Sequence, residues 1–162
     1  MNKLQVGDVA PDFEADSTEG LVSLSKLENK MVVLYFYPKD MTPGCTIQAQ
    51  EFSCLYKEFK KLDVLVLGIS KDSLDTHHRF CTKANIKYPL LVNIDNEIPN
   101  LYGTLKEKST FGKNYFGIVR ATFLIGKDRK LLKIWNNIKP QGHAQKVLDQ
   151  VNISKMLQKS GF

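Results

Sequence analysis

Residues 31–59 read MVVLYFYPKDMTPGCTIQAQEFSCLYKEF, and this stretch decides the fold. Its first seven residues, 31–37, are all apolar or aromatic, which is typical of a short strand buried on both faces. A turn-prone segment with two prolines and a glycine follows at residues 38–44. We then expect a helix, because apolar side chains recur at i, i+3, i+4 and i+7 on Phe52, Leu55, Tyr56 and Phe59.

Cys45 falls on the first turn of this expected helix, directly after the turn at 38–44. The first backbone N–H groups of a helix have no intrahelical partner, and the helix dipole favours negative charge there. A thiol in such a place is converted more readily to the thiolate, which is the reactive form. The alternative interpretation is a small buried apolar side chain, as most free cysteines are. The placement favours a reactive cysteine.

The composition is that of one globular domain covering residues 1–162, with 43% hydrophobic and 25% charged residues. No apolar run approaches the roughly 20 residues of a membrane-spanning helix, and residues 1–13 lack the apolar core of a secretory signal. We therefore expect a cytoplasmic protein with no membrane partner. The odd number of cysteines, three, argues against a secreted disulfide framework.

The net charge of +6 raises the question of a nucleic-acid partner. The lysines, however, are spread from Lys3 to Lys159 and do not cluster with aromatic residues as they do on a binding face. We expect a solvated basic surface and no nucleic-acid partner.

Short strands and helices alternate along the rest of the chain. Their order predicts parallel strands first and an antiparallel hairpin afterwards, in one mixed α/β sheet with helices on both faces. Strands at 12–15 and 21–24 predict an N-terminal β-hairpin. The layout is compatible with a thioredoxin-like fold and with other α/β sandwiches. The remaining expected elements are strands at 64–69, 90–92, 118–125 and 131–135, helices ending near 84, at 98–102 and from about 143, and a polar loop at 103–117.

Two motifs make the chain similar to a known family. The segment YFYPKDMTPGCT at 35–46, together with RATFLI at 120–125, resembles the peroxiredoxins, and most closely their bacterioferritin-comigratory (peroxiredoxin Q) subfamily. The similarity includes VGDVAPDF at 6–13 and covers nearly the whole chain. The Pro-x-x-x-Thr-x-x-Cys pattern is far more specific than a single CxxC. The resemblance implies a thioredoxin fold and a thiol-dependent peroxidase activity without a metal or an organic cofactor.

The resemblance implies that Cys45 is the peroxidatic cysteine. Its thiolate would attack one oxygen of hydrogen peroxide or an alkyl hydroperoxide, release water or an alcohol, and become a sulfenic acid. The Thr42 hydroxyl would contact the thiolate and the peroxide, and helix capping is a compatible second role. Pro38 and Pro43 would fix the loop and limit water at the thiolate. Backbone N–H groups near Gly44 and Cys45 would hold the attacked oxygen.

Arg120 is a charged residue in the otherwise apolar expected strand at 118–125. A buried guanidinium is costly unless it meets an anion, although from the sequence alone an exposed strand end is an equal alternative. By resemblance this is the active-site arginine, which would stabilise the Cys45 thiolate and orient the peroxide. Gln48 stands where many members of the subfamily carry glutamate, so we expect no charge-based role for it.

The sulfenic acid needs a second thiol, and the position five residues after Cys45, which is cysteine in many relatives, is Gln50 here. Cys54 lies nine residues along the same expected helix, about 13 Å away and on its opposite side, too far for a disulfide without unwinding. Cys81 lies on a separate expected helix, as in a subset of the subfamily. We expect a Cys45–Cys81 intramolecular disulfide, with a one-cysteine cycle as the alternative. The family implies a thioredoxin-like reductant, and this geometry needs only a monomer.

His77, His78 and Cys81 share one stripe of the helix expected to end near residue 84. The i, i+4 spacing of His77 and Cys81 could ligate a metal or lower the pKa of the Cys81 thiol. Because no paired motif such as CxxC is present, we expect a partly exposed histidine pair and no metal.

Two other functions compete with a thiol peroxidase. A thiol–disulfide oxidoreductase has the same fold, but Thr42 replaces the thiol that would resolve a mixed disulfide. A chaperone-like or nucleic-acid-binding module would use the basic surface instead of Cys45.

Overall fold

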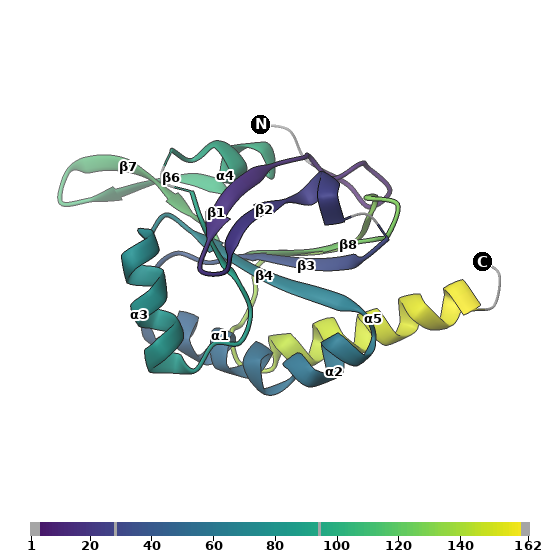
Figure 1. Ribbon diagram of the computed structural model, residues 1–162. Coiled ribbons are helices and arrows are strands. Elements are labelled where there is room, and N and C mark those ends of the chain that lie inside the picture. Colours follow the sequence, from purple (N-terminus) through teal and green to yellow (C-terminus); the bar gives the residue numbers. More distant parts are fainter. Residues whose placement is uncertain (1–3, 28, 94, 160–162) are drawn as a thin grey trace.

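The computed structural model of the protein describes residues 4–27, 29–93 and 95–159. Within them, seven strands form one mixed sheet in the order β2-β1-β5-β4-β3-β8-β9, and β6 pairs with β7 separately (Figure 1). The strands are β1 (Glu14–Ser17), β2 (Gly20–Ser23), β3 (Met31–Phe36), β4 (Val64–Ser70), β5 (Leu90–Val92), β6 (Leu105–Thr110), β7 (Lys113–Ile118), β8 (Ala121–Ile125) and β9 (Leu131–Trp135). The helices are α1 (Pro43–Cys54), α2 (Tyr56–Lys61), α3 (Leu74–Ala84), α4 (Glu97–Leu101) and α5 (His143–Lys159), with a 3₁₀ turn η1 (Leu24–Leu27).

The centre of the sheet follows the predicted strand order. Strands β3, β4 and β5 are parallel neighbours, whereas β8 pairs antiparallel with β3 and β9 pairs antiparallel with β8. The N-terminal hairpin β1–β2 is confirmed, with each predicted boundary shifted by one or two residues. This mixed α/β architecture is the predicted thioredoxin-like fold.

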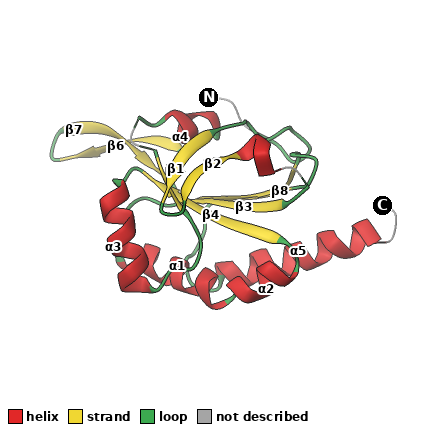
Figure 2. Cartoon of the chain, in the orientation of Figure 1, coloured by secondary structure: helices red, strands yellow, loops and turns green. Residues whose placement is uncertain are grey.

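Strand β3 is buried throughout because its alternate side chains enter two different cores. Met31, Val33 and Tyr35 face a core under α1, α2, α3 and α5, while Val32 and Leu34 face a second core on the opposite side. Figures 1 and 2 show the four longer helices on one face, and β1, β2, η1 and α4 toward the other. Both faces carry helices, as predicted, but the longer ones share a single face.

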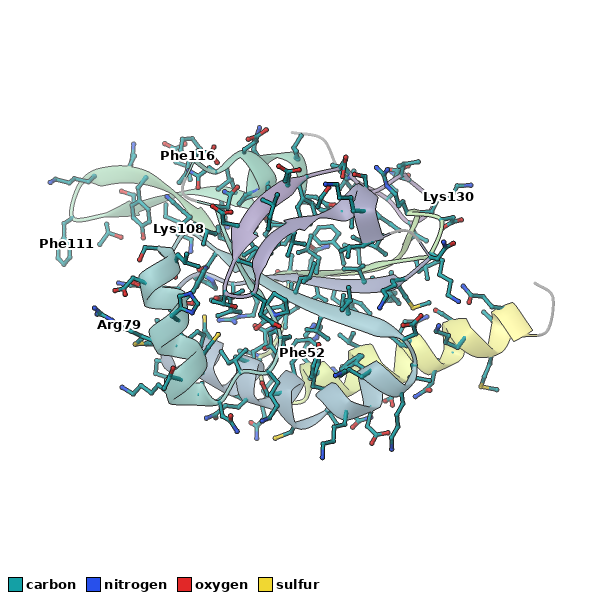
Figure 3. All side chains as sticks on the ribbon, viewed as in Figure 1. Phe52, Arg79, Lys108, Phe111, Phe116 and Lys130 are labelled. Carbon is teal, nitrogen blue, oxygen red and sulfur yellow. The ribbon has the colours of Figure 1, made fainter. Side chains whose placement is uncertain are left out.

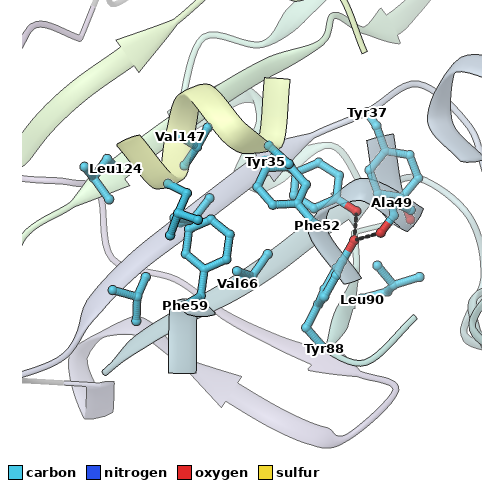
Figure 4. Packing of buried hydrophobic residues seen from close by; sticks show 14 of the residues in the cluster. Tyr35, Tyr37, Ala49, Phe52, Phe59, Val66, Tyr88, Leu90, Leu124 and Val147 are labelled. Carbon is cyan, nitrogen blue, oxygen red and sulfur yellow. Dashed lines mark hydrogen bonds between the residues drawn. The ribbon is translucent and has the colours of Figure 1, made fainter. Parts of the chain in front are cut away.

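The core beneath α1 is built on aromatic rings (Figure 4). Tyr35 stacks on Phe52 of α1 with ring centroids 4.8 Å apart, and the Tyr35 and Tyr88 hydroxyls lie 2.7 Å apart. Tyr88 also donates a hydrogen bond of 3.1 Å to the Ala49 carbonyl oxygen. Gly68 of β4 leaves room for Tyr35, since a Cβ at Gly68 would stand 2.9 Å from Tyr35 Cζ. These contacts fix α1, and with it Cys45, on the sheet.

The prediction of a polar loop at 103–117 is wrong, because β6 and β7 form a hairpin there. Its turn residues Phe111 and Gly112 both have positive φ, at 53° and 76°, as the tight two-residue hairpin turn requires. Most of its side chains are exposed, and Figure 3 shows Phe111 at its far end. With no apolar face to bury, the two strands carry no alternating pattern that a sequence reading could detect.

The predicted strand at 118–125 is also corrected. Ile118 ends β7, and β8 begins only at Ala121, so Arg120 lies in the short connection between two strands. Of the helices in the described part of the chain, none combines the length and the apolar content of a membrane span.

Candidate active site

Cys45 is the third residue of α1, which begins at Pro43 directly after the loop that leaves β3. Proline suits the first position of a helix, because its missing N–H would have no intrahelical partner there. The N–H groups that follow, of Gly44 and Cys45, point toward the helix N-terminus and favour negative charge. The Cys45 side chain is only 2% exposed, so its sulfur is almost completely covered by the surrounding residues.

Arg120 meets Cys45 because of the direction of β8. Since β8 runs antiparallel to β3, its first residue, Ala121, pairs with Phe36 at the end of β3. Arg120 therefore lies beside the loop that leads into α1. Its Nη2 donates to Cys45 Sγ at 3.4 Å, so the guanidinium faces the sulfur and is half-buried. The alternative, an arginine at an exposed strand end, is therefore wrong.

Gln48 holds the other branch of the same guanidinium. Its Oε1 accepts from Arg120 Nη1 at 2.6 Å, and the side chain is fully buried one turn after Cys45. Its Nε2 has no hydrogen-bond partner among the described residues. Sequence reasoning missed this contact, although the i, i+3 spacing from Cys45 was a signal that could have found it.

Gly44 lies against Arg120 as well. A Cβ at Gly44 would stand 3.3 Å from Arg120 Nη2 and 3.4 Å from Pro140 Cγ. The first distance is tight, so a side chain at this position would require the guanidinium to shift by a few tenths of an ångström.

Thr42 precedes α1 and has extended backbone angles, φ −78° and ψ 154°. Among the described residues, its side chain caps no backbone N–H of α1. Instead, Oγ1 donates a hydrogen bond of 2.9 Å to the Lys39 carbonyl oxygen. The hydroxyl hydrogen is therefore engaged, and the Oγ1 lone pairs are left to accept. Pro38, half-buried, and Pro43, exposed, bracket this loop at its two ends.

The structure does not bring Cys81 to Cys45, and all three cysteines are free thiols. The Cys81 side chain forms a hydrogen bond with the Thr18 side chain. The Thr18 backbone N–H in turn donates to the Leu90 carbonyl oxygen of β5. Cys45 instead lies near the start of β8, and β4 and β3 separate β5 from β8. The two free thiols therefore lie on separate helices, next to different strands of the sheet.

Half-burial raises the pKa of the Cys81 thiol, with the Thr18 hydrogen bond opposing that rise and the charges of Asp40 and Glu19 adding to it. The alternative in which His77 lowers the pKa of the Cys81 thiol is therefore not what the structure shows. Cys54 is exposed at the end of α1, well outside this environment.

The prediction of a partly exposed histidine pair is wrong for His77, which is fully buried, and right for His78, which is exposed. Both ring nitrogens of His77 have protein partners, Asp40 and the Leu91 carbonyl oxygen. The described residues contain no cluster of three or more side chains suited to hold a metal ion.

A third histidine, His143, lies in the core behind Arg120. It is 3% exposed, packs edge-on against Phe52 and Trp135, and its Nε2 lies 2.8 Å from Thr122 Oγ1. Burial, together with the positive charges of Lys146 and Arg120, lowers the pKa of His143 to about 4. The ring is thus neutral at physiological pH.

Comparisons with known proteins give matches over most of the chain. Residues 6–134 match the model of the AhpC/TSA family. The chain is 43% identical over 152 residues to a putative peroxiredoxin bcp of Helicobacter pylori strain J99, covering 93% of this chain and 100% of that protein. A cysteine-to-serine variant of PrxQ from Xylella fastidiosa superposes with a TM-score of 0.89 at 32% identity, covering 96% and 99% of the two chains.

A further solved structure is the bacterioferritin comigratory protein of Xanthomonas campestris, studied as trapped intermediate and ligand complexes for its alkyl peroxide reduction activity. It superposes with a TM-score of 0.83 at 33% identity, covering 88% of this chain and 91% of that one.

Proposed function

Because the chain belongs to the AhpC/TSA family, among the Bcp (peroxiredoxin Q) peroxiredoxins, and is therefore a thiol peroxidase, we propose that Cys45 is its peroxidatic residue. The observation that supports this assignment best is the 3.4 Å contact between Arg120 Nη2 and Cys45 Sγ. A guanidinium at that distance stabilises a thiolate, and the N-terminus of α1 adds to the effect.

The peroxidase step is a displacement at oxygen. The Cys45 thiolate attacks one peroxide oxygen, the O–O bond breaks, and the leaving oxygen takes a proton and departs as water or an alcohol. Cys45 becomes a sulfenic acid. Arg120 donates to the peroxide as negative charge moves onto its oxygens, and the first-turn N–H groups of α1 do the same from the other side.

Thr42 completes the arrangement as an acceptor. Because its hydrogen is donated to Lys39, the Oγ1 oxygen can accept from the remaining O–H of a hydroperoxide. That contact would turn the peroxide so that one oxygen faces the sulfur. Pro38 and Pro43 hold the loop and limit the water around it.

Cys81 resolves the sulfenic acid in this proposal. The Cys81 sulfur attacks the Cys45 sulfur, the S–O bond breaks, and hydroxide leaves with the thiol proton as water. Because the two free thiols lie on separate helices, the start of α1 and the second half of α3 unfold locally before the disulfide forms. A thioredoxin-like dithiol then reduces the disulfide, and a monomer in the cytoplasm suffices for the cycle.

Hydrogen peroxide and alkyl hydroperoxides are the proposed substrates. Alkyl peroxide reduction is attributed to the Xanthomonas campestris relative, which supports the second class here. Pro43, where the loop meets α1, is exposed, so the alkyl group of a bound hydroperoxide can extend toward solvent there.

The test measures thioredoxin oxidation on addition of hydrogen peroxide or cumene hydroperoxide, with wild-type protein and with Cys45→Ser. We expect peroxide-dependent turnover that disappears in the variant. Insulin reduction without peroxide would indicate a thiol–disulfide oxidoreductase instead. Salt-sensitive nucleic-acid binding that Cys45→Ser leaves unchanged, in the absence of turnover, would favour a binding module.

A further inference from the structure

A buried polar network joins the loop that leads to Cys45 with the helix that carries Cys81. His77 Nδ1 lies 2.7 Å from Asp40 Oδ2, and His77 Nε2 lies 2.8 Å from the Leu91 carbonyl oxygen. Because a carbonyl oxygen only accepts, Nε2 carries a hydrogen, and His77 Nδ1 and Asp40 share the other proton. Both side chains are inaccessible to solvent.

Further hydrogen bonds attach this pair to the sheet. Tyr37, the residue after β3, donates from its hydroxyl to Asp40 Oδ1 at 2.6 Å. The Asp40 backbone N–H donates to Asp72 Oδ2 at 2.9 Å, and Ser70 at the end of β4 donates to the same oxygen at 2.7 Å. The pair is thus held by residues at the ends of three neighbouring strands, β3, β4 and β5.

We propose that Asp40 and His77 form an anchor that stays intact while the segments beyond it unfold and the Cys45–Cys81 disulfide closes. The anchor confines the unfolding to residues 41–45 and 78–81 and keeps the two thiols within reach of each other. Asp40 and His77 are positioning residues for the resolving step. This inference rests on the proposed role of Cys81.

The lengths of chain on either side of the anchor fit this role. Cys45 follows Asp40 by five residues, and Cys81 follows His77 by four. At about 3.4 Å per extended residue, the two segments reach about 17 Å and about 14 Å from the anchor. Once extended, the two cysteines can therefore come within the Cα–Cα distance of about 4.4–6.8 Å that a disulfide needs without moving the anchor.

The distribution of burial favours the same limit. Met41 and Pro43 are exposed on one segment, and His78 and Arg79 are exposed on the other, while the buried side chains of these segments, Cys45 and Phe80, are apolar. Local unfolding proceeds most easily where few groups are buried, whereas separating a buried hydrogen-bonded pair leaves an uncompensated polar group. The anchor is thus the natural boundary of both unfolding segments.

An intact anchor makes the resolving reaction an encounter between two ends tied at a common point. Tethering of this kind raises the effective concentration of one thiol at the other. Without it, the loop and α3 would separate after oxidation, and the sulfenic acid would wait longer for its partner. A longer wait exposes Cys45 to a second peroxide and to sulfinic acid formation.

The test compares the two steps in rapid-quench experiments with hydrogen peroxide, using full-length protein with Cys54→Ser as background. Sulfenic acid formation and disulfide formation are followed separately by mass spectrometry. For His77→Gln we expect the first rate within about twofold of the background and the second slowed about tenfold or more, with more sulfinic acid formed. His78→Gln, on the exposed neighbour, is the matched control and should change neither rate.

Asp40→Asn is the conservative rescue. Asparagine can accept from Tyr37 and donate to a neutral His77, so it keeps the hydrogen bonds of the anchor. We expect its disulfide rate within about threefold of the background, unlike that of Asp40→Ala. A disulfide rate in His77→Gln that equals or exceeds the background would overturn the proposal, because the Asp40–His77 pair would then have no effect on the resolving step or would slow it.

Hydrogen exchange on the wild-type protein provides a test that needs no variant to fold. After oxidation, amides in 41–46 and 78–84 should lose protection, while the His77 N–H, which bonds to the Ser73 carbonyl oxygen, should keep it. Loss of protection across the whole of α3 would refute the anchor. If oxidised wild-type protein contains no Cys45–Cys81 disulfide, the proposed function itself fails in its resolving step, which is a different result.

Discussion

Gln48 Oε1 accepts a hydrogen bond of 2.6 Å from Arg120 Nη1, so an uncharged amide orients the guanidinium that faces Cys45. A neutral partner fixes the direction of the guanidinium without offsetting its charge. The full positive charge of Arg120 is then available to the sulfur, which lies on the other branch.

Replacing Gln48 with glutamate tests this arrangement. A carboxylate would pair with Arg120 and add a negative charge near the Cys45 thiolate, so the thiolate becomes less favourable. We expect alkylation of Cys45 by iodoacetamide at neutral pH to be slower in Gln48→Glu than in the wild type. Gln48→Met, which removes the acceptor without adding charge, separates orientation from electrostatics. An unchanged alkylation rate in Gln48→Glu would show that the charge at this position is irrelevant.

Arg120→Ala should reduce the second-order rate constant with hydrogen peroxide by about 100-fold or more, because it removes the main cationic donor at the sulfur. The fold should change little, since the side chain is half-buried and outside the strands. Arg120→Lys keeps the charge but cannot contact Gln48 and Cys45 together, so it should recover only part of the rate. Stopped-flow kinetics and urea unfolding measure the two effects. Equal rates for Arg120→Ala and wild type would remove Arg120 from the mechanism.

For Thr42 the informative pair is Thr42→Val and Thr42→Ser. Valine has nearly the same shape but no acceptor, so the rate constant with hydrogen peroxide should fall about 10- to 100-fold. Serine keeps the oxygen and should stay close to wild type. Because the threonine side chain makes no capping bond in the described structure, helix stability should be similar in both variants. A valine variant as fast as the serine variant would argue for a purely structural residue.

The two remaining cysteines should behave differently from each other. Cys81→Ser should still form the Cys45 sulfenic acid but accumulate sulfinic acid under repeated turnover, whereas Cys54→Ser should match wild type. In the reduced protein, the raised pKa of Cys81 should make its alkylation slower than that of the exposed Cys54 at neutral pH. Peptide mapping after one equivalent of peroxide reports both. An unchanged oxidation pattern in Cys81→Ser would support the one-cysteine cycle.

The central strands could be predicted because their side chains obey simple patterns, whereas the helix expected from Phe52, Leu55, Tyr56 and Phe59 is divided in the structure into α1 and α2 at Leu55. The unbroken apolar run at 31–37 is possible only where both faces of a strand are covered, which is what β3 shows. The hairpin β6–β7 was missed because its strands bury neither face. Phe111 and Gly112 at its turn then read as part of a polar loop.

The contacts of the site were harder to predict than its residues. The resemblance to peroxiredoxins identified Arg120, but its partner Gln48 lies 72 positions away and looked unimportant without a charge. The burial of His77 and its pairing with Asp40 were missed for a related reason. Periodicity marks apolar positions as buried, whereas a buried polar pair becomes visible only when sheet order brings its two segments together.

His143 gives the protein a pH-dependent stability that can be measured. Its pKa is about 4 in the folded protein and about 6.5 when unfolded, because burial disfavours the charged ring. Above pH 6.5 both states are neutral at this residue and it has no effect. Between pH 6.5 and 4 only the unfolded state binds the proton, so stability falls as pH falls, by about 3 kcal/mol in total. Below pH 4 the loss levels off.

The variant His143→Gln removes this titration while keeping a group that can bond to the Thr122 hydroxyl. Urea unfolding of wild type and variant should therefore give free energies that converge as pH is lowered from 7 to 4.5, because only the wild type loses stability through this histidine. His78→Gln, at an exposed histidine, should follow the wild-type curve throughout. Parallel curves for wild type and His143→Gln would mean that the buried ring already accepts the proton near its ordinary pKa, and the packing of Phe52 and Trp135 around it would then have to open at mildly acidic pH.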